Sequence, residues 1–97
     1  MHVRLTTWPL KPHSTDRAGS VVRRYEKVLH DLPGHVSTTF YFDPAGSLVC
    51  FSVWNDEDKA IAVTSRARNA LQRELADVLT GEPTTTIVPA FVHDEGR

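Results

Sequence analysis

The chain has 97 residues, of which 40% are hydrophobic and 24% charged, which suits a globular protein with one modest core. Its formal net charge of −1 excludes the strongly basic surface typical of nucleic-acid-binding domains. One cysteine excludes an internal disulfide, and the lack of a long apolar run argues against a membrane span or secretory signal. We therefore expect one cytoplasmic domain over residues 1–97 that binds neither nucleic acid nor membranes.

The first part of the chain predicts a strand, a helix and a second strand. The first strand covers residues 3–10, where prolines then end the pairing. The helix starts at a capping residue within 14–16 and runs to about residue 31, because apolar residues recur every three or four positions. Pro33 and Gly34 stop it. His35–Phe42 is rich in β-branched and aromatic residues and predicts the second strand.

The third strand, Leu48–Trp54, is the most apolar stretch of the chain. Six of its seven residues are apolar or aromatic, a pattern that predicts a central strand covered on both faces. Residues 43–46, Asp-Pro-Ala-Gly, form a strong type I turn signal. The short turn predicts an antiparallel hairpin between the second and third strands.

A second helix and a last strand complete the predicted order. Asn55 or Asp56 caps the helix, and its apolar face continues to about residue 80. Whether the helix breaks near residue 64 is left open. Residues 84–93 predict the last strand.

The predicted order is therefore βαββαβ, an α+β ferredoxin-like fold. It places both helices on one face of a four-stranded antiparallel sheet. The other face stays bare, and the apolar third strand would expose a large patch there. We therefore predict a homodimer in which two sheets pack face to face about a two-fold axis, a dimeric α+β barrel.

Four segments of the sequence carry a family resemblance. They are Leu32-Pro33-Gly34, the hairpin at 43–46, the stretch 52–58 that enters the second helix, and 75–81 before a Thr- and Val-rich strand. With these segments the chain resembles the antibiotic-biosynthesis-monooxygenase-like (ABM-like) group of dimeric α+β barrels over most of its length. The group includes cofactor-independent monooxygenases of polycyclic phenolic or quinonoid compounds, haem-degrading enzymes and signalling proteins. The resemblance thus implies a small aromatic ligand and no cofactor.

The resemblance also points to particular positions. The quinone-forming oxygenases of this group place a Trp at the end of the third strand, and Trp54 matches it. Their Asn and Tyr positions fall on Cys50 and Ala60. Their Arg position falls near Gln72 or Arg73, and helical phase favours Gln72. The Asn, Trp and His of the haem-degrading branch have no counterparts, so that activity is not expected.

We predict a substrate pocket on the strand face that carries Trp54. Its predicted lining is Cys50, Ser52, Trp54, Thr39, Tyr41, Tyr25 and Gln72. An apolar wall with a few hydroxyls suits a small aromatic ligand. The alternative is that the same face forms the dimer interface.

No catalytic residue and no metal site can be assigned from the sequence. Cys50 has no His or Lys close in sequence to lower its pKa, and the five histidines lack metal-ligand spacing. Arg66, Arg68 and Arg73 are interpreted as a solvated face with interleaved acidic residues.

Two functions follow from these expectations. The first is an ABM-like homodimer that binds a small aromatic or polyketide-like molecule between sheet and helices, with cofactor-free oxidation by O2 as its activity. The second is a non-catalytic ligand-binding or accessory dimer. Isomerisation or cyclisation ranks below both, since the predicted pocket face offers no carboxylate as general acid or base.

Overall fold

The structure, a computed structural model, describes residues 1–94 except for the side chains of residues 64 and 65. Its elements in chain order are β1 (His2–Trp8), α1 (Thr15–His30), β2 (His35–Phe42), β3 (Leu48–Trp54), α2 (Glu57–Val63), the π-helical turn η1 (Thr64–Arg68), α3 (Asn69–Glu74) and β4 (Thr84–Pro89). This order confirms the predicted βαββαβ arrangement. The second helix is continuous through residue 64, but it passes there through a π-helical turn.

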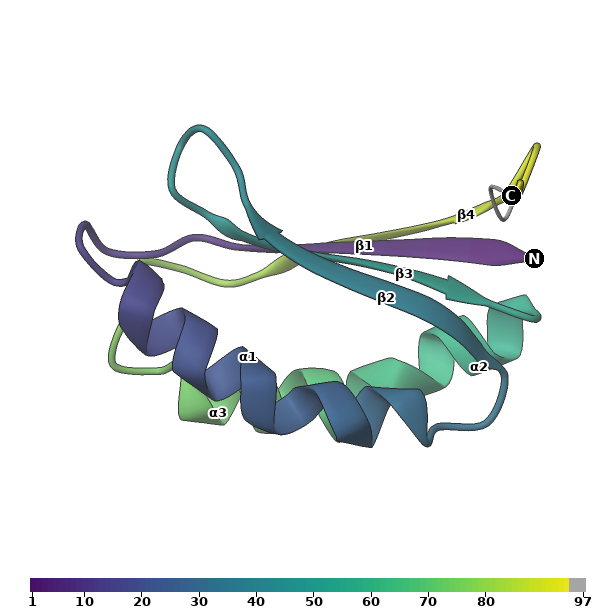
Figure 1. Ribbon diagram of the computed structural model, residues 1–97, viewed down its shortest axis with the longest axis horizontal. Helices are drawn as coiled ribbons and strands as arrows, with labels where there is room; N and C mark the ends of the chain where they lie inside the picture. The colour runs from purple at the N-terminus through teal and green to yellow at the C-terminus, as the bar shows by residue number, and fades with distance from the viewer. Residues whose placement is uncertain (95–97) are drawn as a thin grey trace.

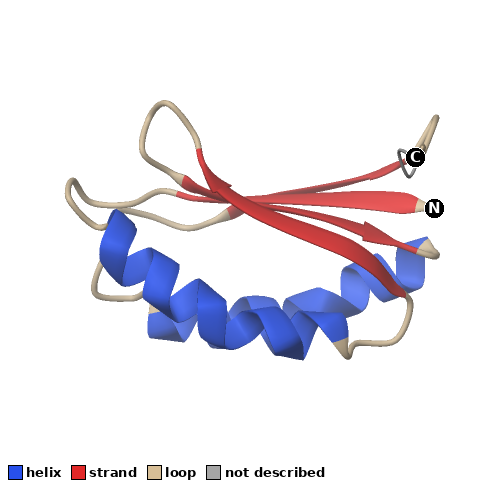
Figure 2. Ribbon diagram, viewed as in Figure 1, coloured by secondary structure: helices blue, strands red, loops and turns tan. Residues whose placement is uncertain are grey.

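All strand pairs in the sheet are antiparallel, in the order β2-β3-β1-β4. The helices cover one face of this sheet and leave the other free, as Figures 1 and 2 show. The ferredoxin-like fold is thereby confirmed, with β3 as a central strand. Residues 1–94 contain no helix with the length and apolar character needed to cross a membrane.

Three element ends differ from the predictions. The strands β1 and β4 end earlier than predicted, at Trp8 and Pro89, and α3 ends at Glu74 rather than near residue 80. The cause at two of these ends is mutual pairing. The segment after β1 and the segment after α3 run side by side, with a bridge between Leu10 and Leu79. The backbone groups of these two segments bond to each other, so they do not continue the strand or the helix.

The hairpin loop is one residue longer than its turn signal suggested. The Asp43 backbone N–H donates to the Ser47 carbonyl at 2.9 Å, and the Asp43 carboxylate accepts from the Ser47 N–H at 2.9 Å. Five residues therefore separate the paired positions Phe42 and Leu48. Side chains alternate between the two faces along a strand. One extra loop residue therefore shifts the pairing of β2 with β3 by one residue, and each side chain of β3 then shares a face with the other set of β2 side chains.

This register corrects the prediction that Thr39 and Tyr41 share a face with Cys50. Thr39 pairs with Phe51 and Tyr41 pairs with Val49, and paired residues in a sheet lie on the same face. Thr39 and Tyr41 therefore lie on the helix-free face.

The helix-covered face carries two core clusters. One gathers around Trp8, and includes Val21, Leu48, Leu71 and Leu75. The other gathers around Trp54, and includes Leu29, Ala60, Val63 and Ala67. Phe40 packs against both clusters, so the region beside Phe40 is where they meet.

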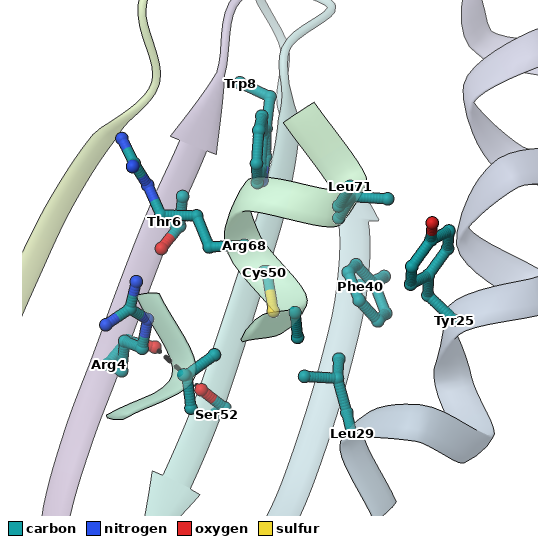
Figure 3. Close-up of a pocket in the computed structure, with 12 residues that line it drawn as sticks. Arg4, Thr6, Trp8, Tyr25, Leu29, Phe40, Cys50, Ser52, Arg68 and Leu71 are labelled. Carbon is teal, nitrogen blue, oxygen red and sulfur yellow. Dashed lines mark hydrogen bonds between the residues drawn. The ribbon is translucent and has the colours of Figure 1, made fainter. Parts of the chain in front are cut away.

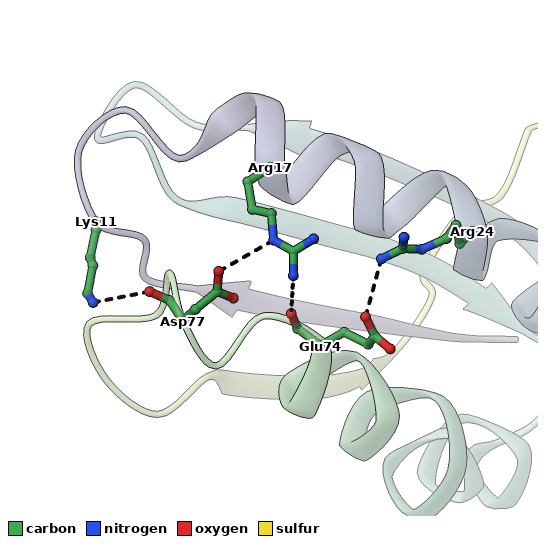
Figure 4. Close-up of polar contacts among 5 residues, drawn as sticks. All are labelled: Lys11, Arg17, Arg24, Glu74 and Asp77. Atoms are coloured by element: carbon green, nitrogen blue, oxygen red, sulfur yellow. Dashed lines mark hydrogen bonds and ion pairs between the residues drawn. The ribbon is translucent and has the colours of Figure 1, made fainter.

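Polar contacts tie α1 to the end of α3. Arg17 pairs with Asp77 at 3.4 Å and Arg24 with Glu74 at 3.2 Å, while the Lys11 ammonium donates to the Asp77 carbonyl at 3.1 Å (Figure 4). Such exposed pairs contribute little stability, about 0–1 kcal/mol each. Through these ion pairs Glu74 and Asp77 are each bound to an arginine of α1.

Candidate functional site

A small cavity lies between the sheet and the helices, where the two core clusters meet (Figure 3). The sheet contributes Arg4, Thr6, Trp8, Phe40, Cys50 and Ser52. The helices contribute Tyr25, Leu29, Val63, Ala67, Arg68 and Leu71. Most of the surface that faces the cavity is apolar, while the lining side chains also carry hydroxyls, one thiol, one indole and two guanidinium groups.

The cavity measures about 20 Å³, enough for about one water molecule. A larger ligand therefore requires its walls to separate. Ala67 and Arg68, which line the helical wall, belong to the π-helical turn η1. Such turns are rare and occur frequently at functional sites.

Arg4 is the most deeply buried charged residue of the cavity, with 3% of its surface exposed. Strand alternation places it on the helix-covered face with Thr6 and Trp8. Its Nη1 donates to the Ala60 carbonyl at 2.9 Å, whereas its buried Nη2 has no hydrogen-bond partner among the described residues. Burial lowers the pKa of Arg4, and the charge of Arg68 lowers it further.

Arg68 reaches the cavity from the helices, where it belongs to the π-helical turn η1. Its Nε is buried and has no partner within the described part of the chain, while its Nη1 donates to the Asn69 side chain at 3.4 Å. The interpretation of Arg68 as part of a solvated face is therefore wrong. Arg68 follows the core residue Ala67 and precedes the core residue Leu71 by three positions, a spacing that places it at the border of the apolar helix face.

The predicted site residues separate into three groups in the structure. Cys50, Ser52 and Tyr25 all line the cavity. Trp54 does not line it and is fully buried beside it, with its Nε1 donating to the Ser52 hydroxyl at 2.8 Å. It borders a second, more open space of about 310 Å³ next to Leu32, Pro33, Lys59, Ala62, Val63 and Arg66.

Gln72, together with Thr39 and Tyr41, lies away from the cavity. Gln72 sits one helical turn beyond Arg68, and its amide donates to the Glu82 carboxylate at 3.0 Å on the protein surface. Gln72 is not among the residues that line this cavity, although its neighbour Leu71 is, because consecutive residues of a helix point in different directions. Four lining residues were not predicted from the sequence: Arg4, Thr6, Trp8 and Arg68.

Comparison with protein-family models and with curated protein sequences finds no match. Solved structures do match. NE2512, a protein of unknown function from Nitrosomonas europaea, is 13% identical over 99% of this chain and 94% of its own, with a TM-score of 0.85. An antibiotic biosynthesis monooxygenase is 16% identical over 95% of this chain and 100% of its own, with a TM-score of 0.76.

A third match carries a ligand. It is a monooxygenase from the gene ActVA-Orf6 of Streptomyces coelicolor in complex with nanaomycin D, 19% identical over 99% of this chain and 92% of its own, with a TM-score of 0.72. The chain has the ABM-like fold. This confirms the fold that the resemblance implied.

In this fold the strand β3 contributes a thiol, Cys50, to the lining of the cavity. Burial raises the pKa of Cys50 from its ordinary value of 9.0 to about 12, so the thiol stays protonated at neutral pH. Because only the thiolate attacks electrophiles, Cys50 is not an activated nucleophile. Among the described residues there is also no group of three or more His, Cys, Asp or Glu that could hold a metal ion.

The raised pKa of Cys50 gives a direct prediction. At pH 8 the thiolate fraction in the folded protein should be roughly a thousandfold below that of the unfolded chain, since the pKa values differ by about three units. We expect iodoacetamide to label Cys50 quickly in 6 M guanidinium chloride and at least a hundredfold more slowly in buffer. Mass spectrometry measures both labelling rates. Equal rates would show that the thiol of the folded protein is accessible and ionised.

Proposed function

We propose that the protein is an ABM-like homodimer that binds a small aromatic or polyketide-like molecule in the cavity between sheet and helices and oxidises it with O2 without a cofactor. The observation that supports this best is the cavity itself, whose lining combines apolar side chains with buried donors that lack a partner among the described residues. The same fold is found in the ActVA-Orf6 monooxygenase, whose structure contains nanaomycin D. A largely apolar pocket with a few polar groups is the usual site for an aromatic ligand.

The lining of the cavity limits the chemistry. Among its described side chains there is no carboxylate and no imidazole, so none serves as a general base at neutral pH. The proposed substrate is therefore a phenol acidic enough to lose its proton without a general base from the protein.

The phenolate supplies all four electrons that reduce O2. One oxygen atom replaces the hydrogen at the carbon para to the phenol oxygen and becomes a quinone carbonyl, and the other oxygen atom leaves as water with the two hydrogens lost by the substrate. The protein contributes orientation, hydrogen bonds and exclusion of water.

The proposed dimer covers the helix-free face of the sheet. Phe51, Tyr41 and Val88 lie on this face and are exposed, and Leu5 lies between them on the central strand β1. An apolar patch of this kind on a soluble protein marks an interface. A second copy related by a two-fold axis presents the same patch and fits it.

A non-catalytic ligand-binding dimer is the second candidate. It is favoured by two positions at which the oxygenases carry Asn and Tyr and this chain carries Cys50 and Ala60. The protonated thiol of Cys50 is a weak hydrogen-bond donor, so the substrate oxygens lose one expected partner.

Oxygen consumption with a panel of dihydroxynaphthalenes tests the proposal. We expect uptake of O2 with quinone formation by the wild-type protein, and at least tenfold less by Ala67→Met, whose longer side chain fills the cavity. Ala76→Met, at an exposed position, is the matched control and should retain full activity. Quenching of tryptophan fluorescence without O2 uptake would support the non-catalytic binder, and neither quenching nor uptake would contradict both candidates.

A further inference from the structure

We propose that the cavity is an anion site, whose ligand is an aromatic molecule with an ionised oxygen, a carboxylate or a phenolate, held by Arg4 and Arg68. This inference rests on the cavity assigned in the proposed function and specifies the charge of its ligand.

The first observation is a set of buried donors without acceptors. Arg4 Nη2, Arg68 Nε and Trp8 Nε1 are all buried and lack a hydrogen-bond partner among the residues that the structure describes, and all three residues line the cavity. Buried polar groups are nearly always paired in folded proteins. Because each of the three atoms is a donor, the missing partner is an acceptor.

The second observation is an uncompensated positive charge. In Figure 3 the two arginine side chains lie on the same side of the cavity, toward β1, and no acidic side chain is part of the described lining. The acidic residues that follow Arg68, Glu74 and Asp77, pair instead with Arg24 and Arg17. Arg4 is the buried charge of the two. Buried charges normally have a counter-ion, and the proposed anion would supply it.

The third observation separates an aromatic anion from an inorganic one. Opposite the arginines, the wall consists of Leu29, Phe40, Tyr25 and Leu71 (Figure 3). Sulfate or phosphate gains nothing from such a wall, whereas an aromatic ring buries its apolar surface against it. The ligand therefore places its charged oxygen toward β1 and its ring toward α1.

Calorimetric titration with three ligands of one shape tests the charge. They are 2-naphthoate, 2-naphthol and the neutral 2-naphthalenemethanol, at pH 7 and low salt. We expect 2-naphthoate to bind at least tenfold more tightly than the neutral alcohol. If the affinity for 2-naphthol rises as the pH approaches the pKa of its hydroxyl group, the site binds a phenolate. If the affinity for 2-naphthol does not change with pH, the site binds a carboxylate.

Matched variants assign the preference to the arginines. Arg68→Met and Arg4→Met should reduce the preference for the anion to less than twofold, while Arg73→Met, an exposed arginine on α3, should retain it. Equal affinity for 2-naphthoate and the alcohol in the wild-type protein would overturn the anion site and leave the proposed ligand-binding function standing. Failure of all three ligands to bind would count against the proposed function.

A ligand-free measurement tests the anion site independently. Without a ligand, Arg68 adds an unpaired charge near Arg4, so Arg68→Met should raise the thermal midpoint by a few degrees, and Arg73→Met should leave it unchanged. A lower midpoint for Arg68→Met would show that the protein already supplies a counter-ion, and would overturn the anion site even if the ligands bind.

Discussion

Replacing Phe51 by aspartate is expected to convert the proposed dimer into monomers. Phe51 lies on the central strand β3, on the helix-free face, and 39% of its surface is exposed. A carboxylate there would lose its hydration when two sheets pack together. Central aromatic anchors of interfaces cost about 2–4 kcal/mol when removed, so the dimer dissociation constant should rise by roughly 30- to 1,000-fold. Sedimentation velocity at micromolar concentration measures this change.

Phe42 provides a matched control for Phe51. Its exposure, 40%, is almost the same, but it points to the opposite face because it pairs with Leu48. Phe42→Asp should therefore remain dimeric. A wild-type protein that sediments as a stable monomer, or equal dissociation of both variants, would contradict packing through the helix-free face.

Replacing Trp54 by alanine should cost the most stability of any single change at β3. Trp54 has 0% exposure and packs in the cluster that contains Leu29, Ala60 and Val63. Truncation of a buried aromatic residue typically costs about 3–5 kcal/mol, which is a large part of the stability of a small domain. Urea unfolding followed by circular dichroism measures the change in the free energy of unfolding.

Two milder variants separate packing from hydrogen bonding at Trp54. Ser52→Ala leaves the buried Trp54 Nε1 without its acceptor, which costs about 1–3 kcal/mol. Trp54→Phe removes that donor, so adding Ser52→Ala to it should cost clearly less than Ser52→Ala alone. Trp54→Phe should also keep ligand affinity within threefold, because Trp54 does not line the cavity. A tenfold loss of affinity with unchanged stability would instead show that Trp54 contacts the ligand.

The elements of the fold could be predicted because local signals are strong in this chain. The apolar run of Leu48–Trp54 predicted a central strand, and β3 is central. The three-and-four spacing of apolar residues predicted α1, whose core residues Ala18, Val21, Val22 and Leu29 are buried. These patterns depend only on neighbours in sequence, and tertiary packing preserves them.

The faces of the hairpin could not be predicted from the same signals. The turn signal at residues 43–46 was correct, but Ser47 also joins the loop. That one residue decides which side chains of β2 meet Cys50. Because of it, Phe40 and not Tyr41 lies beside the cavity.

The arginines of the cavity were missed for a different reason. Arginine usually lies on the protein surface and is rarely buried without a partner, so the residue type of Arg4 and Arg68 did not indicate a cavity. Their sequence positions did carry a signal, because Arg4 alternates with Trp8 and Arg68 adjoins Ala67. Only the three-dimensional packing shows that both reach one cavity, and that Glu74 and Asp77 are engaged elsewhere.

The proposed ligand binds between the sheet and the helices, and this claim can be tested by spectroscopy. Nitrogen-15 correlation spectra recorded during addition of 2-naphthoate test it most directly, with the two indole signals assigned through Trp8→Phe and Trp54→Phe. The claim predicts that the Trp8 indole and the Arg68 Nε–H signals shift most, in proportion to ligand occupancy. Shifts centred on the backbone signals of Tyr41, Phe51 and Val88, with the Trp8 signal unchanged, would place the ligand on the helix-free face and contradict the claim.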